Sequence, residues 1–308
     1  MLICRLCLTK TNDFKHLCDE NGEDSEIYHI TVKYFDPMME ELVPRLPVDK
    51  ESVEFHNWKI SYEKSHILKS ICQKGQDDKC KEDNDEFCEL CTYRHALELP
   101  HLPDMVFRKN KLTLQHPNGA VLEFLPMDAL RSVENGKQPL QVACAQEWKE
   151  SRPETLVEEK FKPFDWTFTT EYQGTVNKMF RIEKCEQKLN KFKLMQREKI
   201  LFYHDLTLFE DELHDNGISS CSVKIRVMPS GFFILLRHFL RVDNVLLKMH
   251  DTRFHYEIEN DYVFKEYTKR EATYDELKKV PPPLFTLPNE IEQYMPIKEQ
   301  MAYKLFFK

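Results

Sequence analysis

The fold is decided by residues 219–259, which have the sequence SSCSVKIRVMPSGFFILLRHFLRVDNVLLKMHDTRFHYEIE. Apolar and basic side chains alternate near its start, in the order Val223, Lys224, Ile225, Arg226 and Val227. This period of two predicts a strand with one face toward water. Residues 232–239 are nearly all apolar, which is typical of a strand buried on both faces. Asp243 and Asn244 then separate two apolar runs and predict a two-residue hairpin turn.

Further strands are predicted on either side of this stretch. Residues 249–252, Met-His-Asp-Thr, predict another turn before the next apolar alternation. Residues 112–124 alternate around a Pro-Asn-Gly turn and predict a second hairpin. Residues 53–62, centred on Trp58, predict a single strand.

Helical signals lie at the margins of these strands. Asp128 is expected to cap a short helix over residues 128–133, and residues 183–199 carry apolar side chains at helical spacing. Residues 296–308 predict a C-terminal helix with Pro296 in its first turn. Its apolar stripe consists of Ile297, Met301 and Leu305. We therefore predict an α+β fold with a mainly antiparallel β-sheet core and helices at the margins and C-terminus.

Composition predicts two domains. Residues 1–48 carry a CxxC motif and an acidic stretch, and prolines near their end predict a linker. Residues 49–308 carry the strand signals and form the predicted main domain. Residues 71–92 within it are polar and acidic and contain four cysteines, so we expect a loop insert there.

Charge and hydropathy exclude several classes of protein. The formal net charge is −8, which argues against direct nucleic-acid binding. Apolar runs are all shorter than the roughly 18 residues of a membrane span, and the start lacks the apolar stretch of a signal peptide. We therefore expect a soluble protein of the cytoplasm and also the nucleus. In those compartments the ten cysteines are expected to be thiols or metal ligands.

Motifs for catalysis are missing from the sequence. The chain has only seven glycines in 308 residues. It contains neither of the glycine-rich phosphate-binding motifs, G-x-x-x-x-G-K-S/T and G-x-G-x-x-G. The G-x-S-x-G and H-E-x-x-H motifs are also absent. Residues 209–215, FEDELHD, crowd four carboxylates and a histidine together, which suits a metal or acid–base site but better fits a solvated turn. We expect a protein that is not an enzyme.

Six segments in collinear order carry a family resemblance. The longest is FEDELHDNGISSCSVKIRVMPSGFFILLRHFLRVDNVLLKMHDTR at residues 209–253. The others are WKISYEKSHILKS (58–70), LELPHLPDMVF (97–107), VACAQEWKESR (142–152), KPFDWTFTTEYQGT (162–175) and PPPLFTLPNEIEQYMPIKE (281–299). Together they resemble the TOR signalling pathway regulator (TIPRL-like) family over residues 50–308. Residues 1–48 and the insert at 71–92 depart from the family pattern.

The resemblance implies a regulatory protein that binds catalytic subunits of type 2A-family serine/threonine phosphatases and acts in TOR signalling. It further implies a monomer that requires no cofactor. Family positions implicated in phosphatase binding correspond to Asp128, Leu189, Met249 and Asp251. Considered without the resemblance, Asp128 fits a helix N-cap, Met249 a buried strand end and Asp251 an Asx-turn residue.

Two CxxC motifs suggest zinc. Cys4-Arg-Leu-Cys7 has the spacing of half a zinc knuckle, because two thiolates on a tight turn can reach one ion. Cys88-Glu-Leu-Cys91 has the same spacing. The sequence thus predicts a zinc site formed by Cys4, Cys7, Cys88 and Cys91.

Two alternatives involving these cysteines stay open. Cys72 and Cys80 could complete a zinc site with Cys88 and Cys91 inside the insert. Residues 3–23, ICRLCLTKTNDFKHLCDENGE, resemble the start of the zinc-finger-associated domain of insect transcription regulators. That resemblance implies, as an alternative function, a zinc-binding nuclear or transcription-associated factor.

Overall fold

The computed structural model describes residues 49–69, 71–72, 80, 87–97, 99, 101–133, 140–141, 163–164, 167–213 and 215–307. These residues belong to one compact unit, Leu46–Lys308, while the other unit is Met1–Arg45. The predicted ligands Cys4 and Cys7 lie outside the described residues.

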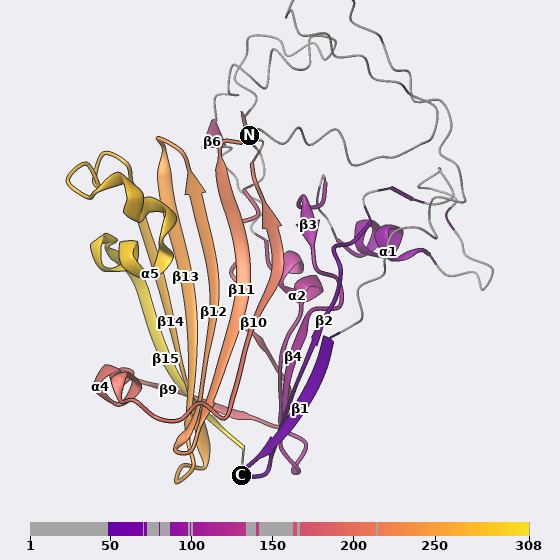
Figure 1. Cartoon of the computed structure of the whole chain (residues 1–308), viewed down its shortest axis with the longest axis vertical. Helices are drawn as coiled ribbons and strands as arrows, with labels where there is room; N and C mark the ends of the chain where they lie inside the picture. Colours follow the sequence, from indigo (N-terminus) through magenta and orange to yellow (C-terminus); the bar gives the residue numbers. More distant parts are fainter. Residues whose placement is uncertain are drawn as a thin grey trace, which may run out of the picture. The chain divides into compact units, whose positions relative to one another are not determined.

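An eight-stranded antiparallel sheet forms the larger layer (Figure 1). Its spatial order is β3 (Met105–Val106), β10 (Phe202–Asp211), β11 (Gly217–Met228), β12 (Gly231–Val242), β13 (Leu246–Glu257), β14 (Tyr262–Thr273), β15 (Ile297–Phe306) and β9 (Arg181–Cys185). The predicted strand over 232–239 lies within β12, between β11 and β13 in the sheet. It is nearly continuously buried, as its apolar sequence predicts.

The turns of this sheet differ from the prediction at two places. The β12–β13 turn has three residues, since Val242 pairs with Leu246, and Asn244 takes a φ of 61° within it. The turn predicted at 249–252 is wrong, because β13 runs without interruption through these positions. Met249 pairs with Phe239, and Asp251 pairs with Arg237 across the strands. An aspartate whose charge is matched by a neighbouring arginine can stay inside a strand.

A five-stranded antiparallel sheet forms the second layer. Its order is β1 (Asp49–Phe55), β2 (Trp58–Lys64), β4 (Lys111–Gln115), β5 (Val121–Phe124) and β8 (Thr175–Val176). The predicted hairpin over 112–124 is confirmed as β4 and β5. The single strand predicted over 53–62 is instead a hairpin, because His56 and Asn57 form a two-residue turn with φ of 44° and 69°. A separate pair consists of β6 (Leu140–Gln141) and β7 (Pro163–Phe164).

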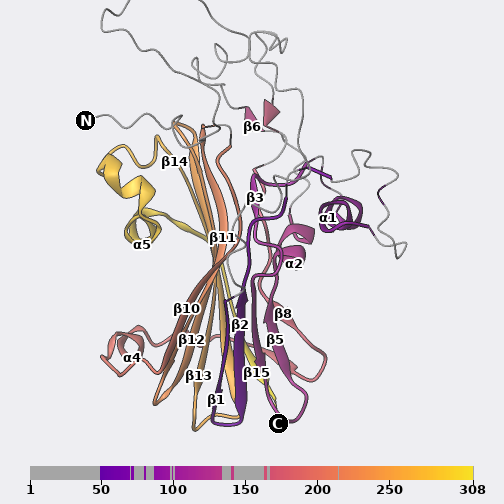
Figure 2. The same ribbon diagram turned by 45° about the vertical axis from the view of Figure 1, so that its right-hand side comes forward.

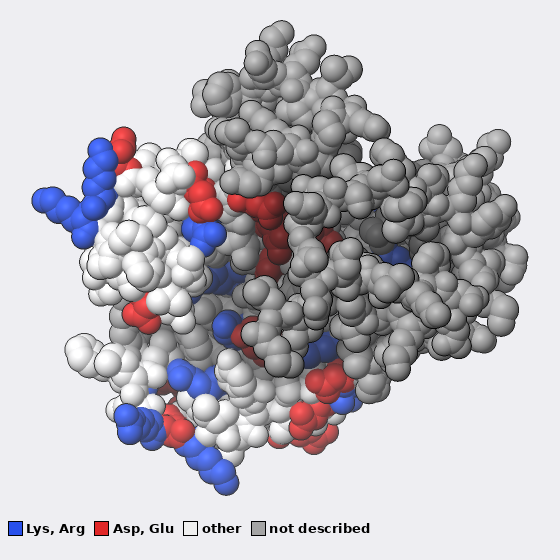
Figure 3. Space-filling view, turned by 45° about the horizontal axis from the view of Figure 1, so that its top comes forward, with Lys and Arg blue, Asp and Glu red and all other residues white. Residues whose placement is uncertain are grey.

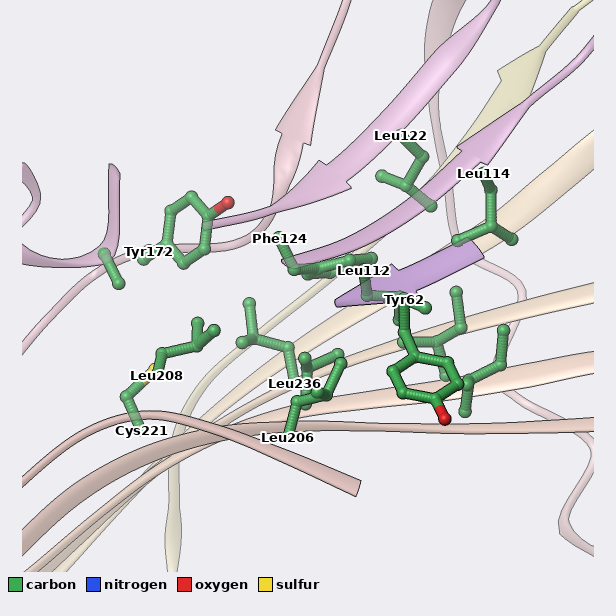
Figure 4. Packing of buried hydrophobic residues seen from close by; sticks show 14 of the residues in the cluster. Tyr62, Leu112, Leu114, Leu122, Phe124, Tyr172, Leu206, Leu208, Cys221 and Leu236 are labelled. Atoms are coloured by element: carbon green, nitrogen blue, oxygen red, sulfur yellow. The ribbon is translucent and has the colours of Figure 1, made fainter. Parts of the chain in front are cut away.

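The main core lies between the two sheets (Figure 4). Its fully buried members include Leu112, Leu114, Leu122 and Phe124 from one sheet and Leu206, Leu208, Cys221 and Leu236 from the other. Phe124 meets Phe254 of β13 edge-on, with ring centroids 5.5 Å apart. Complete burial of each such side chain contributes about 1.5–3 kcal/mol to folding.

Short helices cover the opposite, outer face of the large sheet. Figures 1 and 2 show α5 (Pro288–Ile291) beside β13 and β14, together with the adjoining η3 (Pro282–Thr286) and η4 (Glu292–Tyr294). We call the apolar cluster on this face the outer core; it consists of Phe239, Leu247, Met249, Ala272, Leu277, Val280, Ile291 and Met295. The central strands are therefore buried on both faces.

The fold class is confirmed, but two predicted helices are corrected. Residues 297–306 form β15, and the helical turns of this region precede it at 282–294. A spacing of four residues places Met301 and Leu305 on one face of a strand as well as of a helix, so the pattern fits both; Ile297 departs from this alternation because the register of β15 shifts between Lys269 and Arg270. Residues 183–199 contain the end of β9 and only the short helix α4 (Lys191–Met195). No helix among the described residues has the length and apolarity needed to cross a membrane.

Truncation of Phe124 tests the inter-sheet core. Phe124→Ala should lower the free energy of unfolding by about 3–5 kcal/mol, because it removes a fully buried ring and leaves a cavity. Phe192, which is 85% exposed, is the matched control, and Phe192→Ala should change stability by less than about 0.5 kcal/mol. Urea titration of both variants measures the difference, and equal effects would contradict the assigned core.

Candidate protein-binding site

Asp251 lies in the middle of β13 on the outer face and is 1% exposed. Arg237, its cross-strand neighbour on β12, donates Nε to Oδ1 at 2.6 Å and Nη2 to Oδ2 at 2.7 Å. This bidentate geometry is the strong form of an arginine–carboxylate contact. Burial alone would raise the pKa of Asp251, but the charge and hydrogen bonds of Arg237, followed by the charge of Arg253, lower it.

The ion pair extends into a network that attaches the short helices to the sheet. Arg253 donates Nη2 to Asp251 at 2.6 Å and to Oε1 of Glu292 at 2.8 Å. Arg237 also reaches Glu292 at 3.1 Å and Oδ1 of Asn289 at 2.7 Å. Arg270 donates to the carbonyl of Met295 at 2.8 Å and lies 3.5 Å from Glu292. We call Arg237, Asp251, Arg253, Arg270 and Glu292 the outer ion network.

Met249 lies two positions before Asp251 on the same face of β13. It is 0% exposed and belongs to the outer core with Ile291 and Met295. The strand interior, rather than the predicted turn, is thus the environment of Met249 and Asp251. Both residues support α5 and η4 from below instead of projecting into solvent.

Asp128 is the most exposed of the four predicted binding residues, with 25% of its side chain accessible. It is the third residue of α2 (Pro126–Arg131), so the predicted N-cap role is wrong and Leu125 occupies that position. Its Oδ2 accepts a hydrogen bond of 2.6 Å from Oγ1 of Thr175. Arg131 lies 3.5 Å from the other oxygen. The carboxylate is therefore held in a fixed orientation while part of it stays open to solvent.

Leu189 is 9% exposed and packs against Phe264 and Ala302 at the other end of the large sheet. Its backbone N–H donates to Oε2 of Glu266 at 3.2 Å. These contacts fasten the segment between β9 and α4 to the sheet.

The four predicted residues do not form one surface. Successive side chains of a strand face opposite sides of the sheet, so Asp251 and His250 point apart. Nδ1 of His250 lies 2.9 Å from the carbonyl of Thr170, whose hydroxyl donates to the carbonyl of Ala129 in α2. Asp128 therefore belongs to the inter-sheet side, whereas Met249, Asp251 and Leu189 belong to the outer face.

The acidic cluster lies at the end of β10 and in the turn that follows, with His214 outside the described residues. Asp211 accepts backbone hydrogen bonds from Asp104 and Leu213 and is 6% exposed, so its carboxylate supports the turn from a buried position and only the other acidic residues fit a solvated turn. Other acidic residues line a groove that also touches η3 and α5, namely Glu210, Glu212, Asp215 and Asp243. Burial, aided by the charge of Glu212, raises the pKa of Glu210.

In Figure 3, acidic and basic side chains are interspersed over the described part of one face.

The cysteines of the insert converge. The four sulfur atoms of Cys72, Cys80, Cys88 and Cys91 all lie within 4.8 Å of one another. Cys88 and Cys91 thus share a cluster with Cys72 and Cys80. The predicted pairing with Cys4 and Cys7, and the nuclear-factor alternative built on that segment, concern residues outside those described.

Arg237 is a functional residue that no motif identifies, although its position inside the apolar run 232–239 is visible in the sequence. A charged side chain within the apolar run 232–239 must find a partner, because burying an unpaired charge is costly. The pairing register identifies that partner as Asp251. Glu292 could not be found in this way, because it reaches the network from a distant segment through the placement of η4 on the sheet.

Comparisons with known proteins show the class to which this two-sheet protein belongs. The model of the TIP41-like family matches residues 105–278. The human TIP41-like protein is 46% identical over 257 residues, covering 82% of this chain and 88% of the relative. The type 2A phosphatase activator tip41 of Schizosaccharomyces pombe is 31% identical over 238 residues, covering 75% of this chain and 86% of the relative. The type 2A phosphatase activator TIP41 of Saccharomyces cerevisiae is 34% identical over 249 residues, covering 74% of this chain and 65% of the relative. This chain belongs to the TIP41-like family.

Removing the charge of Asp251 should destabilise the fold. Asp251→Asn leaves the buried Arg237 sharing the single carboxylate of Glu292 with Arg253 and Arg270, and we expect a loss of about 3–5 kcal/mol. Asp275→Asn is the control, because that side chain is 83% exposed and its loss should cost less than about 0.5 kcal/mol. Equal stabilities of the two variants in urea titration would contradict the buried pair.

The same pair predicts a pH dependence of stability. Because the folded-state pKa of Asp251 is lowered, its contribution is fully present above the unfolded pKa of about 3.9. The contribution is lost as the pH falls through the lowered folded-state value. Thermal unfolding of the unmodified chain and of Asp251→Asn should therefore be compared as the pH is lowered from about 5. The unmodified chain should lose stability more steeply than the variant. Parallel curves of stability against pH would refute the assignment.

Proposed function

We propose that this chain is a regulatory protein that binds the catalytic subunits of type 2A-family serine/threonine phosphatases and takes part in TOR signalling. The observation that carries the proposal is membership of a family in which two relatives are named type 2A phosphatase activators. The family match over residues 105–278 includes Asp128, Leu189, Met249 and Asp251. The chain would act as a monomeric binding partner in the cytoplasm and nucleus rather than as an enzyme.

Asp128 is the residue proposed to touch the phosphatase directly. Its carboxylate is partly accessible, and the hydrogen bond from Thr175 fixes its orientation. An oriented carboxylate suits an arginine or lysine on the partner, because such charge-assisted hydrogen bonds combine strength with directional specificity. Fixing the group before binding also reduces the entropy lost on association.

Met249, Asp251 and Leu189 are proposed to act as positioning residues. Their side chains are at least nine-tenths buried, so the surfaces they support would make the contact. Met249 and Asp251 support α5 and η4, next to the acidic groove that η3 and α5 border. Arg241 also lines this groove and pairs with Asp243, so Glu210, Glu212 and Asp215 supply the carboxylates that suit basic side chains. Substitution of Met249 or Asp251 would weaken phosphatase binding by displacing α5 and η4, and substitution of Leu189 would do so by releasing the segment between β9 and α4.

Calorimetric titration of the full chain with a purified type 2A catalytic subunit tests the proposal. We expect one-to-one binding, with an interface of about 800 Å² per partner. Asp128→Ala should weaken binding by about 30-fold, which corresponds to about 2 kcal/mol for an anchor residue. Asp128→Asn retains an oxygen acceptor for Thr175 and separates the loss of charge from the loss of local structure.

The control for this titration is Asp275→Asn, which removes an exposed carboxylate whose ion pair, with Lys278, is separate from the contacts of Asp128. It should bind as the unmodified chain does. Thermal unfolding of each variant shows whether the fold is retained. Absence of binding by the unmodified chain would overturn the proposed phosphatase binding. Unchanged affinity of a folded Asp128→Ala variant would overturn the proposed contact role of Asp128.

A further inference from the structure

We infer that Cys72, Cys80, Cys88 and Cys91 form a structural zinc site inside the 71–92 insert. Their four sulfur atoms lie within 4.8 Å of one another, and the Cys72 and Cys88 sulfurs are 4.0 Å apart. Tetrahedral zinc with Zn–S bonds of about 2.3 Å requires sulfur–sulfur distances of about 3.8 Å. The arrangement is thus close to that of a filled site, and small side-chain movements would complete it.

The donor set selects the metal. All four groups are thiols, and soft sulfur ligands favour zinc over the hard cations calcium and magnesium, which prefer oxygen. Cys80 and Cys91 are 0% exposed, Cys72 is 5% exposed and Cys88 is half-buried, so three of the four thiols are shielded from water. Four protein ligands in a closed environment are typical of a structural rather than a catalytic zinc site.

Convergence distinguishes these residues from ordinary core cysteines. Cys221, for comparison, is 1% exposed and packs within β11 as a small apolar side chain. Cys185 packs in the separate cluster around Leu189. In contrast, the insert brings together four thiols separated by seven, seven and two residues. A packing role alone does not require four sulfur atoms at one point.

The helix α1 (Glu89–Ala96) presents two of the ligands in the required geometry. Cys88 occupies its N-cap position and Cys91 lies in its first turn, so both sulfurs are at the same end of the helix. The N-terminus of a helix carries a partial positive charge, which stabilises metal-bound thiolates. The N-cap side chain makes no capping hydrogen bond, so its sulfur remains available to a metal.

A metal at this point would hold α1 on the main domain. An isolated helix of eight residues is too short to be stable in water. The remaining attachments of α1 include a hydrogen bond of 3.0 Å from the Tyr93 hydroxyl to the carbonyl of Arg108 and an ion pair between Glu89 and Arg108. Figures 1 and 2 both show α1 next to α2, the helix that carries Asp128. Zinc would therefore stabilise the region beside the proposed contact residue.

Metal analysis of the full chain tests this site independently of phosphatase binding. The chain, purified in reducing buffer with zinc and then dialysed, should contain one zinc ion per molecule. Cys80→Ser and Cys91→Ser should each abolish retention of the ion. Cys185→Ser is the matched thiol control and should retain it. Zinc retained by Cys80→Ser but lost by Cys4→Ser would overturn the inference in favour of a site that uses the N-terminal CxxC.

A second measurement avoids dependence on the folding of the variants. Titration of the unmodified chain with a mercurial reagent should release one zinc ion as thiols are consumed, detected with a chromogenic chelator. Substituted cobalt should give the strong visible bands of tetrahedral thiolate coordination. Absence of bound metal, or a disulfide between any two of the four cysteines in the freshly isolated chain, would overturn the inference.

Discussion

Burial of β12 and β13 on both faces is the constraint on which the rest of the structure depends. Their inner faces form the main core with the five-stranded sheet, and their outer faces lie under α5, η4 and the outer core. Charged side chains in such strands must be matched, and the Arg237–Asp251 pair meets this requirement on the outer face. The same pair recruits Glu292 through Arg237 and Arg253, so it also determines where the C-terminal helical turns rest.

Sequence periodicity predicted those strands whose apolar pattern fits a strand but not a helix. Examples are β11 with its alternating burial pattern, the buried strand β12 and the β4–β5 hairpin. Residues 297–306 were predicted as a helix because apolar side chains four residues apart suit both structures, and only pairing with β14 decides between them. The turn predicted at 249–252 failed for a related reason. Local propensity favours a turn there, whereas the cross-strand arginine stabilises the strand.

The candidate sites were predictable to different degrees. The Cys88–Cys91 motif was evident from its spacing, but its partners depend on how the insert folds; the structure brings Cys72 and Cys80 beside it, and Cys4 and Cys7 lie outside the described residues. Asp128, Met249 and Asp251 were selected by resemblance, which carries no information on exposure. The structure separates them: Asp128 keeps an accessible carboxylate, while Met249 and Asp251 are buried beneath α5 and η4. The binding role that the resemblance implies for all three fits this arrangement if the first makes contact and the others position a surface.

Hydrogen exchange of the full chain, alone and bound to a type 2A phosphatase catalytic subunit, tests this division of roles most directly. We expect binding to slow exchange in α2 around Asp128 and in the α5–η4 segment, while the buried centre of β13 is already protected in the free chain. Complex formation that leaves both α2 and the α5–η4 segment unchanged would contradict it.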